Sequence, residues 1–255
     1  MSALHLLIDG PIAELWLDNA GKLNALTTHM LEELDSHCGV LERDPEIRAV
    51  ILTAEGDRAF CAGADIVAWG ALSAADFSRH WVREGHRIFD RLARLSKPTV
   101  AAISAHAFGG GLELAACCDL RVMAPKATLA LPEAQIGIVP GWSGTQRLTR
   151  LLPEPVVKEM ALFGTRLSAE RAHALGFVAE IAEDARAAAR ALAERSLSAS
   201  PRAVEVAKYL IHAAVGEDRA AMIEALGGGM TAGSLDKAEG VAAFQARRKP
   251  EFTGR

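Results

Sequence analysis

Short, uninterrupted apolar segments that alternate with an amphipathic helical segment constrain the fold of this chain most strongly. Residues 48–56 (RAVILTAEG) and 98–105 (PTVAAISA) each predict a strand that is buried on both faces. Between them, residues 76–95 place large apolar side chains on one face of a helix. Continuous apolar strands separated by helices are typical of a mostly parallel sheet that is covered on both faces. The sequence therefore predicts an α/β fold.

The rest of the chain divides into a sheet-containing core and a helical region. Residues 4–9 and 12–17 are short apolar segments separated by a Gly-Pro pair, which predicts a β-hairpin. A further short strand is expected at residues 177–181. Later residues are rich in Ala, Leu, Glu and Arg at helical spacing. We therefore expect two domains, a core of residues 1–190 and a helical subdomain of residues 191–255.

The composition argues against several classes of function. The chain has 255 residues and a formal net charge of −4, whereas a general nucleic-acid binder carries a basic excess. Its four cysteines have neither the spacing of a disulfide framework nor that of a metal site, which predicts free thiols in a reducing compartment. No apolar run approaches the ~18 residues of a membrane span, and the first ten residues resemble no targeting peptide. These features predict a cytoplasmic protein with no metal, membrane or nucleic-acid partner.

Three consecutive glycines within residues 106–120 (HAFGGGLELAACCDL) join a predicted strand to a helix. Such a turn directs free backbone N–H groups at one point, and the helix dipole favours negative charge there. Neither phosphate-binding glycine motif is present, and Glu113 would repel a bound phosphate. An oxyanion that forms only during a reaction, beside a carboxylate that transfers a proton, avoids this repulsion. The alternative interpretation is that the glycines allow close packing and that Glu113 stabilises the first helical turn.

Two further loops carry candidate site residues. Residues 58–66 (RAFCAGADI) have small side chains that let a ligand approach the main chain, and an oxyanion hole commonly needs a second N–H donor from such a loop. Residues 131–150 (LPEAQIGIVPGWSGTQRLTR) contain a second carboxylate, Glu133, in a segment rich in Pro and Gly. Two glutamates can divide the activation of a water and the delivery of a proton. Each loop alone is more typical of an ordinary surface loop, and spacing does not show that Glu113 and Glu133 meet.

Taken together, these stretches resemble the enoyl-CoA hydratase/isomerase (crotonase) family. The resemblance runs nearly end to end, with the motifs in the family's order. It implies an α/β spiral of repeated ββα units, with C-terminal helices that pack into a homotrimer or a dimer of trimers. The residues that carry it are LDNAGKLNAL (17–26), FCAGADI (60–66), AHAFGGGLELA (105–115), CDLRVMA (118–124), LPEAQIGIVPGWSGTQRL (131–148) and SLDKAEGVAAFQARRKPEF (234–252).

The resemblance also implies an acyl-CoA substrate and no separate cofactor, because coenzyme A is part of the substrate. The backbone N–H groups of Ala64 and Gly110 would form the oxyanion hole for the thioester oxygen. Glu113 and Glu133 stand at the two glutamate positions of hydratases, which implies hydration of a 2-enoyl-CoA to a 3-hydroxyacyl-CoA. In this reaction Glu113 helps to activate water for attack at C3, and Glu133 is the main proton relay to C2. The residues implied to bind CoA or the substrate are Lys22, Ala62, Ala64, Asp65, Ile66 and Gly110.

The chain departs from the family pattern near the implied acyl pocket. Residues 104–106 (SAH) replace the usual Asn-Gly-aromatic sequence, and Trp142 and Ser143 stand where small residues are usual. His106 and Trp142 are therefore the candidates for the acyl pocket. Val67 stands where a Lys is often found, which bears on CoA affinity.

Three alternatives stay open. Within the family, the chain could isomerise an enoyl-CoA, because double-bond isomerases can work with one carboxylate. Some members bind AU-rich RNA through a lysine-rich helix, but the corresponding residues 184–212 mix arginines with acidic residues and predict a solvated face. A catalytically inactive family member is the third alternative.

Overall fold

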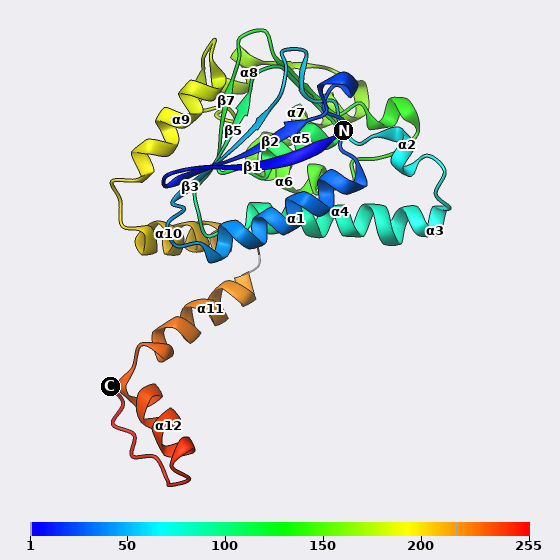
Figure 1. Ribbon diagram of the computed structural model, residues 1–255. Coiled ribbons are helices and arrows are strands. Elements are labelled where there is room, and N and C mark those ends of the chain that lie inside the picture. The colour runs from blue at the N-terminus through cyan, green and yellow to red at the C-terminus, as the bar shows by residue number, and fades with distance from the viewer. Residues whose placement is uncertain (1, 218) are drawn as a thin grey trace. The chain divides into compact units, whose positions relative to one another are not determined.

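Every residue of strands β3 (Ala49–Ala54) and β5 (Thr99–Ile103) is buried in the computed structural model, which describes residues 2–217 and 219–255. Both lie in a six-stranded sheet of order β1-β2-β3-β5-β7-β10 (Figure 1). In this sheet β2, β3, β5, β7 and β10 run parallel to one another, and β1 pairs with β2 as an antiparallel hairpin. The predicted α/β fold is therefore confirmed. The other strands of this sheet are β1 (Ala3–Asp9), β2 (Ile12–Asp18), β7 (Leu120–Met123) and β10 (Glu180–Ile181).

A second sheet of four short strands brings the candidate loops together. Its order is β4-β6-β8-β9, and β4, β6 and β8 are parallel. Each of these three follows a strand of the larger sheet and precedes a helix, so the ββα unit repeats along the chain. Because the ends of adjacent parallel strands meet at one edge, the loops after β4, β6 and β8 converge. The strands are β4 (Ala59–Cys61), β6 (His106–Phe108), β8 (Thr128–Ala130) and β9 (Leu167–Ser168).

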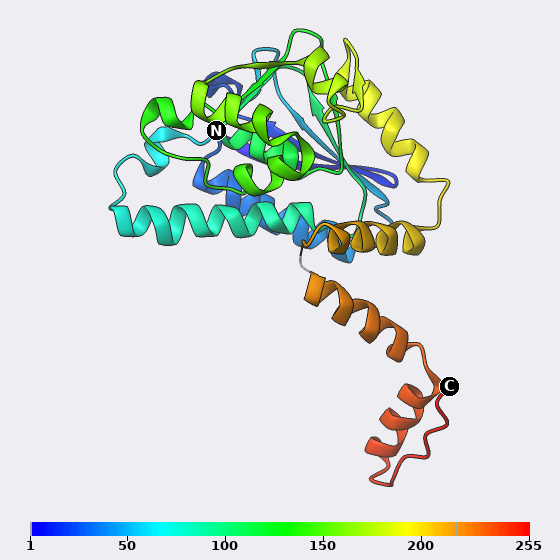
Figure 2. The same cartoon turned by 180° about the vertical axis from the view of Figure 1, so that it is seen from behind.

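The helices of the core surround these converging loops. The side chain of Thr27 caps α1 by accepting a hydrogen bond from the N–H of Met30, and α1 and α4 run side by side (Figures 1 and 2). The longer helices are α1 (Thr28–Arg43), α4 (Arg83–Ala93), α5 (Gly110–Ala116), α6 (Gly144–Leu151), α7 (Glu154–Phe163) and α8 (Ala169–Ala174). The short ones are η1 (Ala20–Lys22), α2 (Ile66–Trp69), α3 (Ala74–Asp76), the π-helical η2 (Phe77–Val82) and η3 (Glu133–Ile136).

Helix α9 (Ala185–Ser196) packs on the larger sheet and belongs to its core. Ala185, Ala189 and Ala193 recur every four residues, so they lie on one face of the helix. These alanines are buried against a cluster that includes Ile51 and Ala102. The expected domain boundary after residue 190 falls inside this helix. Alanines let a helix pack closely on a sheet, but they do not form the stripe of large apolar side chains by which a core helix is recognised in a sequence.

The chain forms two compact units that divide between Val204 and Glu205, within α10 (Pro201–Ala214). The second unit continues through α11 (Arg219–Ala232) and α12 (Leu235–Gln245). Asp236, in the first turn of α12, accepts hydrogen bonds from the backbone N–H groups of Thr253 and Gly254. Within residues 2–217 and 219–255, no helix is long and apolar enough to cross a membrane.

The packing of α9 predicts the effect of enlarging one of its alanines. We expect Ala189→Leu to lower the free energy of unfolding by about 1–3 kcal/mol, because the added atoms overpack a fully buried contact. Ala187→Leu is the matched control, since Ala187 is exposed on the same helix, and we expect it to change stability by less than about 0.5 kcal/mol. Urea unfolding measures both. Equal unfolding midpoints for the two variants would show that α9 does not pack on the sheet.

Candidate active site

The loops after β4, β6 and β8 surround a cavity of about 110 Å³. Seven of the residues predicted from the sequence line it: Ala62, Ala64, Ile66, Gly110, Glu113, Glu133 and Trp142. The structure therefore brings together the three stretches that the sequence singled out, residues 58–66, 106–120 and 131–150. The remaining walls are mostly apolar, with Trp69, Phe77, Trp81, Val82, Ile136, Ile138 and Val139.

Two free backbone donors lie next to each other at this cavity. A methyl group on Gly63 would lie 3.4 Å from the amide nitrogen of Gly110, and one on Gly110 would lie 3.5 Å from that of Ala64. Gly110 begins α5, where the first N–H groups of a helix have no intrahelical acceptor. The backbone N–H of Leu26 donates to the carbonyl of Gly63, and the carbonyl of Leu26 accepts from the N–H of Asp65. These two hydrogen bonds do not involve the N–H of Ala64, which lies between Gly63 and Asp65. In the described part of the chain, neither N–H donates to a protein acceptor, so one anionic oxygen can accept from both.

Glu113 is buried in the first turn of α5 and held by another loop. Its Oε1 accepts hydrogen bonds from the N–H groups of Trp142 (2.8 Å) and Gly144 (2.7 Å). Burial raises the pKa of this carboxyl, while the two N–H groups and the positive charge of Arg147 oppose that rise. A methyl group on Gly144 would lie 2.6 Å from the same oxygen. The carboxylate is thus fixed in one orientation by backbone donors.

Glu133 begins η3 and has a different environment. Its side chain is 7% exposed, and among the described residues its Oε2 has no hydrogen-bond partner. Burial raises its pKa to about 7, and the nearby charge of Glu113 acts in the same direction. The cavity therefore pairs a carboxyl group that is held by N–H donors with one whose Oε2 has no partner among the described residues and whose pKa is raised to about 7.

Trp142 closes one side of the cavity. Its indole N–H donates to the carbonyl of Trp81 (3.2 Å), and its ring lies about 5 Å from the rings of Trp81 and Phe89. A methyl group on Gly85 would collide with the indole, and one on Gly110 would lie 2.9 Å from it. The indole is therefore held by contacts on several sides, and its position sets the space beside Gly110.

Lys22 and Asp65 do not line the cavity. Nζ of Lys22 lies 2.9 Å from a carboxylate oxygen of Asp65, and this hydrogen bond lowers the pKa of Asp65. The other oxygen of Asp65 caps α2 by accepting from the N–H of Val67 (3.1 Å). This pair supports the loop that carries Ala64, and Ile66 lies at the cavity with 54% of its surface exposed.

His106 lies outside the cavity, so its assignment to the acyl pocket is not supported. Its ring stacks on Phe108, with centroids 5.4 Å apart, and its Nδ1 accepts from the N–H of Thr128 (3.2 Å). His106 and Phe108 are two residues apart on β6 and therefore share a face of the strand, opposite to that of Ala107.

Several residues of the site are not predicted from the sequence. The sequence predicts Phe77 and Trp81 only as part of the apolar face of a helix, yet they line the cavity from η2. The N–H groups that hold Glu113 carry no side-chain signal, and their contact spans about thirty residues. In the described residues, no group of three His, Cys, Asp or Glu side chains could hold a metal ion.

Comparisons with known proteins show the family to which this chain belongs. The family model described as enoyl-CoA hydratase/isomerase matches residues 8–255. The probable enoyl-CoA hydratase of Bacillus subtilis is 36% identical, over 100% of both chains. A carnitinyl-CoA dehydratase of Proteus mirabilis is 35% identical, over 99% of both. The crystal structure of an enoyl-CoA hydratase from Bacillus anthracis superposes with a TM-score of 0.81 at 31% identity, over 99% of both chains.

The contact between Gly109 and Glu133 predicts a large cost for Gly109→Ala. Gly109 has φ +52°, and a methyl group there would lie 2.7 Å from Oε1 of Glu133. We expect a loss of about 2–4 kcal/mol in the free energy of unfolding, because φ +52° with ψ −125° is strained for any residue with a side chain and because the methyl group clashes with Glu133. Gly176→Ala is the control: it shares a positive φ (+78°) but meets nothing within 4 Å, so only strain of about 1–2 kcal/mol is expected. Equal losses in urea unfolding would contradict the close contact.

Proposed function

Because this chain belongs to the enoyl-CoA hydratase/isomerase family, we propose that it hydrates a 2-enoyl-CoA to a 3-hydroxyacyl-CoA. One observation carries the proposal: two carboxyl groups and two free N–H groups line one small cavity. Hydration needs a base for the water, an acid for C2 and a site for the negative charge that develops on the thioester oxygen. The cavity offers a candidate for each.

In the proposed mechanism, the thioester oxygen accepts hydrogen bonds from the N–H groups of Ala64 and Gly110. These donors polarise the conjugated thioester and stabilise the enolate-like transition state, an effect typically worth about 3–4 kcal/mol per donor. Glu113 accepts a proton from the water as its oxygen attacks C3. Glu133 donates a proton to C2. One water is added across the double bond, and the two carboxyl groups return to their starting states after one proton exchange.

We propose that CoA follows the loop after β4. Ala62 and Ile66 line the cavity on this side, which supports their assignment to substrate binding. Lys22 is 58% exposed beside this loop, so its ammonium group is accessible to a CoA phosphate while it remains paired with Asp65. The proposed contact to Lys22 is electrostatic and therefore sensitive to salt.

We propose a short acyl group. Trp142 lines the cavity, and its ring lies so close to Gly110 that it limits the space beside the proposed oxyanion hole. The four-carbon crotonyl group is therefore a suitable first substrate.

We also propose that the chain works as a homotrimer or a dimer of trimers. Large apolar side chains are exposed on the second unit, including Met230 (79%) and Phe244 (86%). Exposed apolar side chains of this size are typical of surfaces that another subunit covers.

The proposed function is tested by following the absorbance of the conjugated enoyl thioester with crotonyl-CoA. We expect turnover by the wild type, and a fall in kcat of at least about a hundredfold for Glu113→Gln and for Glu133→Gln, because each removes a group that transfers a proton. Binding of a saturated acyl-CoA should be nearly unchanged in both variants. A wild type that binds the thioester without changing its absorbance would refute short-chain hydration and direct the search to isomerisation of 3-enoyl thioesters.

The pKa of Glu133 predicts the alkaline side of the pH profile. A proton donor must be protonated, so kcat/KM should fall as the pH rises through about 7, where this carboxyl loses its proton. Profiles between about pH 5 and pH 9 for the wild type and Glu133→Gln measure the effect. The residual activity of Glu133→Gln should lack this alkaline limb. A limb that persists in the variant would assign it to another group.

A further inference from the structure

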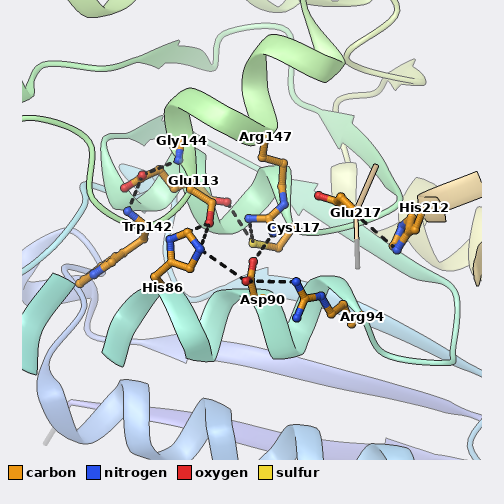
Figure 3. Close-up of polar contacts among 11 residues, drawn as sticks. His86, Asp90, Arg94, Glu113, Cys117, Trp142, Gly144, Arg147, His212 and Glu217 are labelled. Carbon is orange, nitrogen blue, oxygen red and sulfur yellow. Dashed lines mark hydrogen bonds and ion pairs between the residues drawn. The ribbon is translucent and has the colours of Figure 1, made fainter. Parts of the chain in front are cut away.

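Two polar contacts join helix α4 to the beginning of α6. The ring nitrogens of His86 lie 3.1 and 3.3 Å from Oγ of Ser143, and Oδ1 of Asp90 lies 2.7 Å from a guanidinium nitrogen of Arg147. His86 and Asp90 are four residues apart, as are Ser143 and Arg147, so the two contacts lie one helical turn apart. Figure 3 shows Asp90 between His86 and Arg147. The contacts tie the segment that precedes α6 to α4.

This segment has a strained conformation at the residue that His86 contacts. Ser143 has φ +76°, a left-handed conformation that is uncommon for a residue with a side chain. It stands between Trp142 and Gly144, whose N–H groups both donate to Oε1 of Glu113 (Figure 3). A left-handed residue turns the flanking N–H groups toward one point, as in anion-binding backbone nests. The turn of residues 142–144 therefore contains both the strained residue, Ser143, and the two N–H groups that bind Glu113.

We propose that His86 is a positioning residue for Glu113. Through the hydroxyl of Ser143, it holds residues 142–144 in the left-handed turn that binds the carboxylate. The inference rests on the proposed function in taking Glu113 as the base. Neither His86 nor Ser143 lines the cavity, so both act through Glu113. The ion pair of Asp90 with Arg147 is the second tether and keeps a positive charge near the carboxylate.

Loss of the turn of residues 142–144 is expected to raise the pKa of Glu113. The two N–H groups lower its pKa against the effect of burial, so releasing them raises the pKa. The other charged or titratable groups around this network are unchanged by substitution of Ser143. They are Glu133 on η3, Arg147 on α6, Cys117 directly after α5, and His86 and Asp90 on α4.

Four variants separate positioning from simple stabilisation. Ser143→Gly removes the hydroxyl but tolerates the left-handed conformation, so the fold is preserved. His86→Ala removes the ring, and His86→Gln restores a polar group that can reach the hydroxyl. His29→Ala is the matched control, because His29 also pairs with a carboxylate four residues later (Glu33, 3.2 Å) but lies on α1 outside the cavity.

We expect Ser143→Gly and His86→Ala to lower kcat for crotonyl-CoA by about tenfold. The acid limb of kcat/KM should move to higher pH by about one pH unit, because a base with a raised pKa is protonated over a wider range. His86→Gln should recover part of both effects, and His29→Ala should match the wild type. KM should change less than kcat, since neither side chain contacts the substrate.

A second readout does not depend on turnover. Difference infrared spectroscopy follows the carboxyl band of Glu113, assigned with Glu113→Gln, as the pH is varied. A higher titration midpoint in Ser143→Gly and His86→Ala supports the positioning role even if the wild type hydrates no enoyl thioester, in which case only the proposed function fails. An unchanged midpoint and an unchanged acid limb in both variants would overturn the inference, whatever happens to their stability.

Discussion

Three consecutive glycines allow three separate parts of the chain to approach the beginning of α5. A methyl group on Gly109 would meet Glu133, one on Gly110 would meet Trp142, and one on Gly111 would collide with the carbonyl of Cys61. Each contact brings a different loop to the same helix N-terminus. The free N–H of Gly110, the carboxyl of Glu133 and the apolar wall of the cavity all depend on these approaches. A side chain at any of the three positions would separate the groups that the proposed reaction needs together.

The two carboxyl groups of the cavity are buried in different ways, and this difference suits different proposed roles. Glu113 accepts hydrogen bonds from two backbone N–H groups and lies near the charge of Arg147, and these contacts oppose the rise in its pKa that burial causes. Glu133 has an oxygen without a partner in the described residues, and its pKa is raised to about 7. Different environments for two neighbouring carboxyl groups are a common way to make one group a base and the other an acid. The glycines allow the two carboxyl groups to approach each other, and the turn around Ser143 holds Glu113 but not Glu133.

The sequence predicts the core strands well because strands that are buried on both faces need continuous apolar residues, as in β3 and β5. It does not predict where the core ends, because α9 uses alanines such as Ala189 rather than large side chains. Local motifs indicate Glu113 and Glu133, but the approach of the two side chains depends on the pairing of β6 with β8, which no local pattern specifies. That His106 does not line the cavity is likewise not predictable locally, since the face of a three-residue strand is decided by its neighbours. The contact of His86 with Ser143 joins residues far apart in the chain and has no sequence signal.

The central claim is that the cavity adds one water across the double bond of an enoyl thioester. It is tested most directly by incubating the enzyme with crotonyl-CoA in water labelled with heavy oxygen and analysing the product by mass spectrometry. The account predicts a 3-hydroxybutyryl thioester that carries one labelled oxygen at C3, formed by the wild type and not by the double variant of Glu113→Gln with Glu133→Gln. Recovery of unlabelled thioester, with its double bond intact or moved to C3, would contradict it.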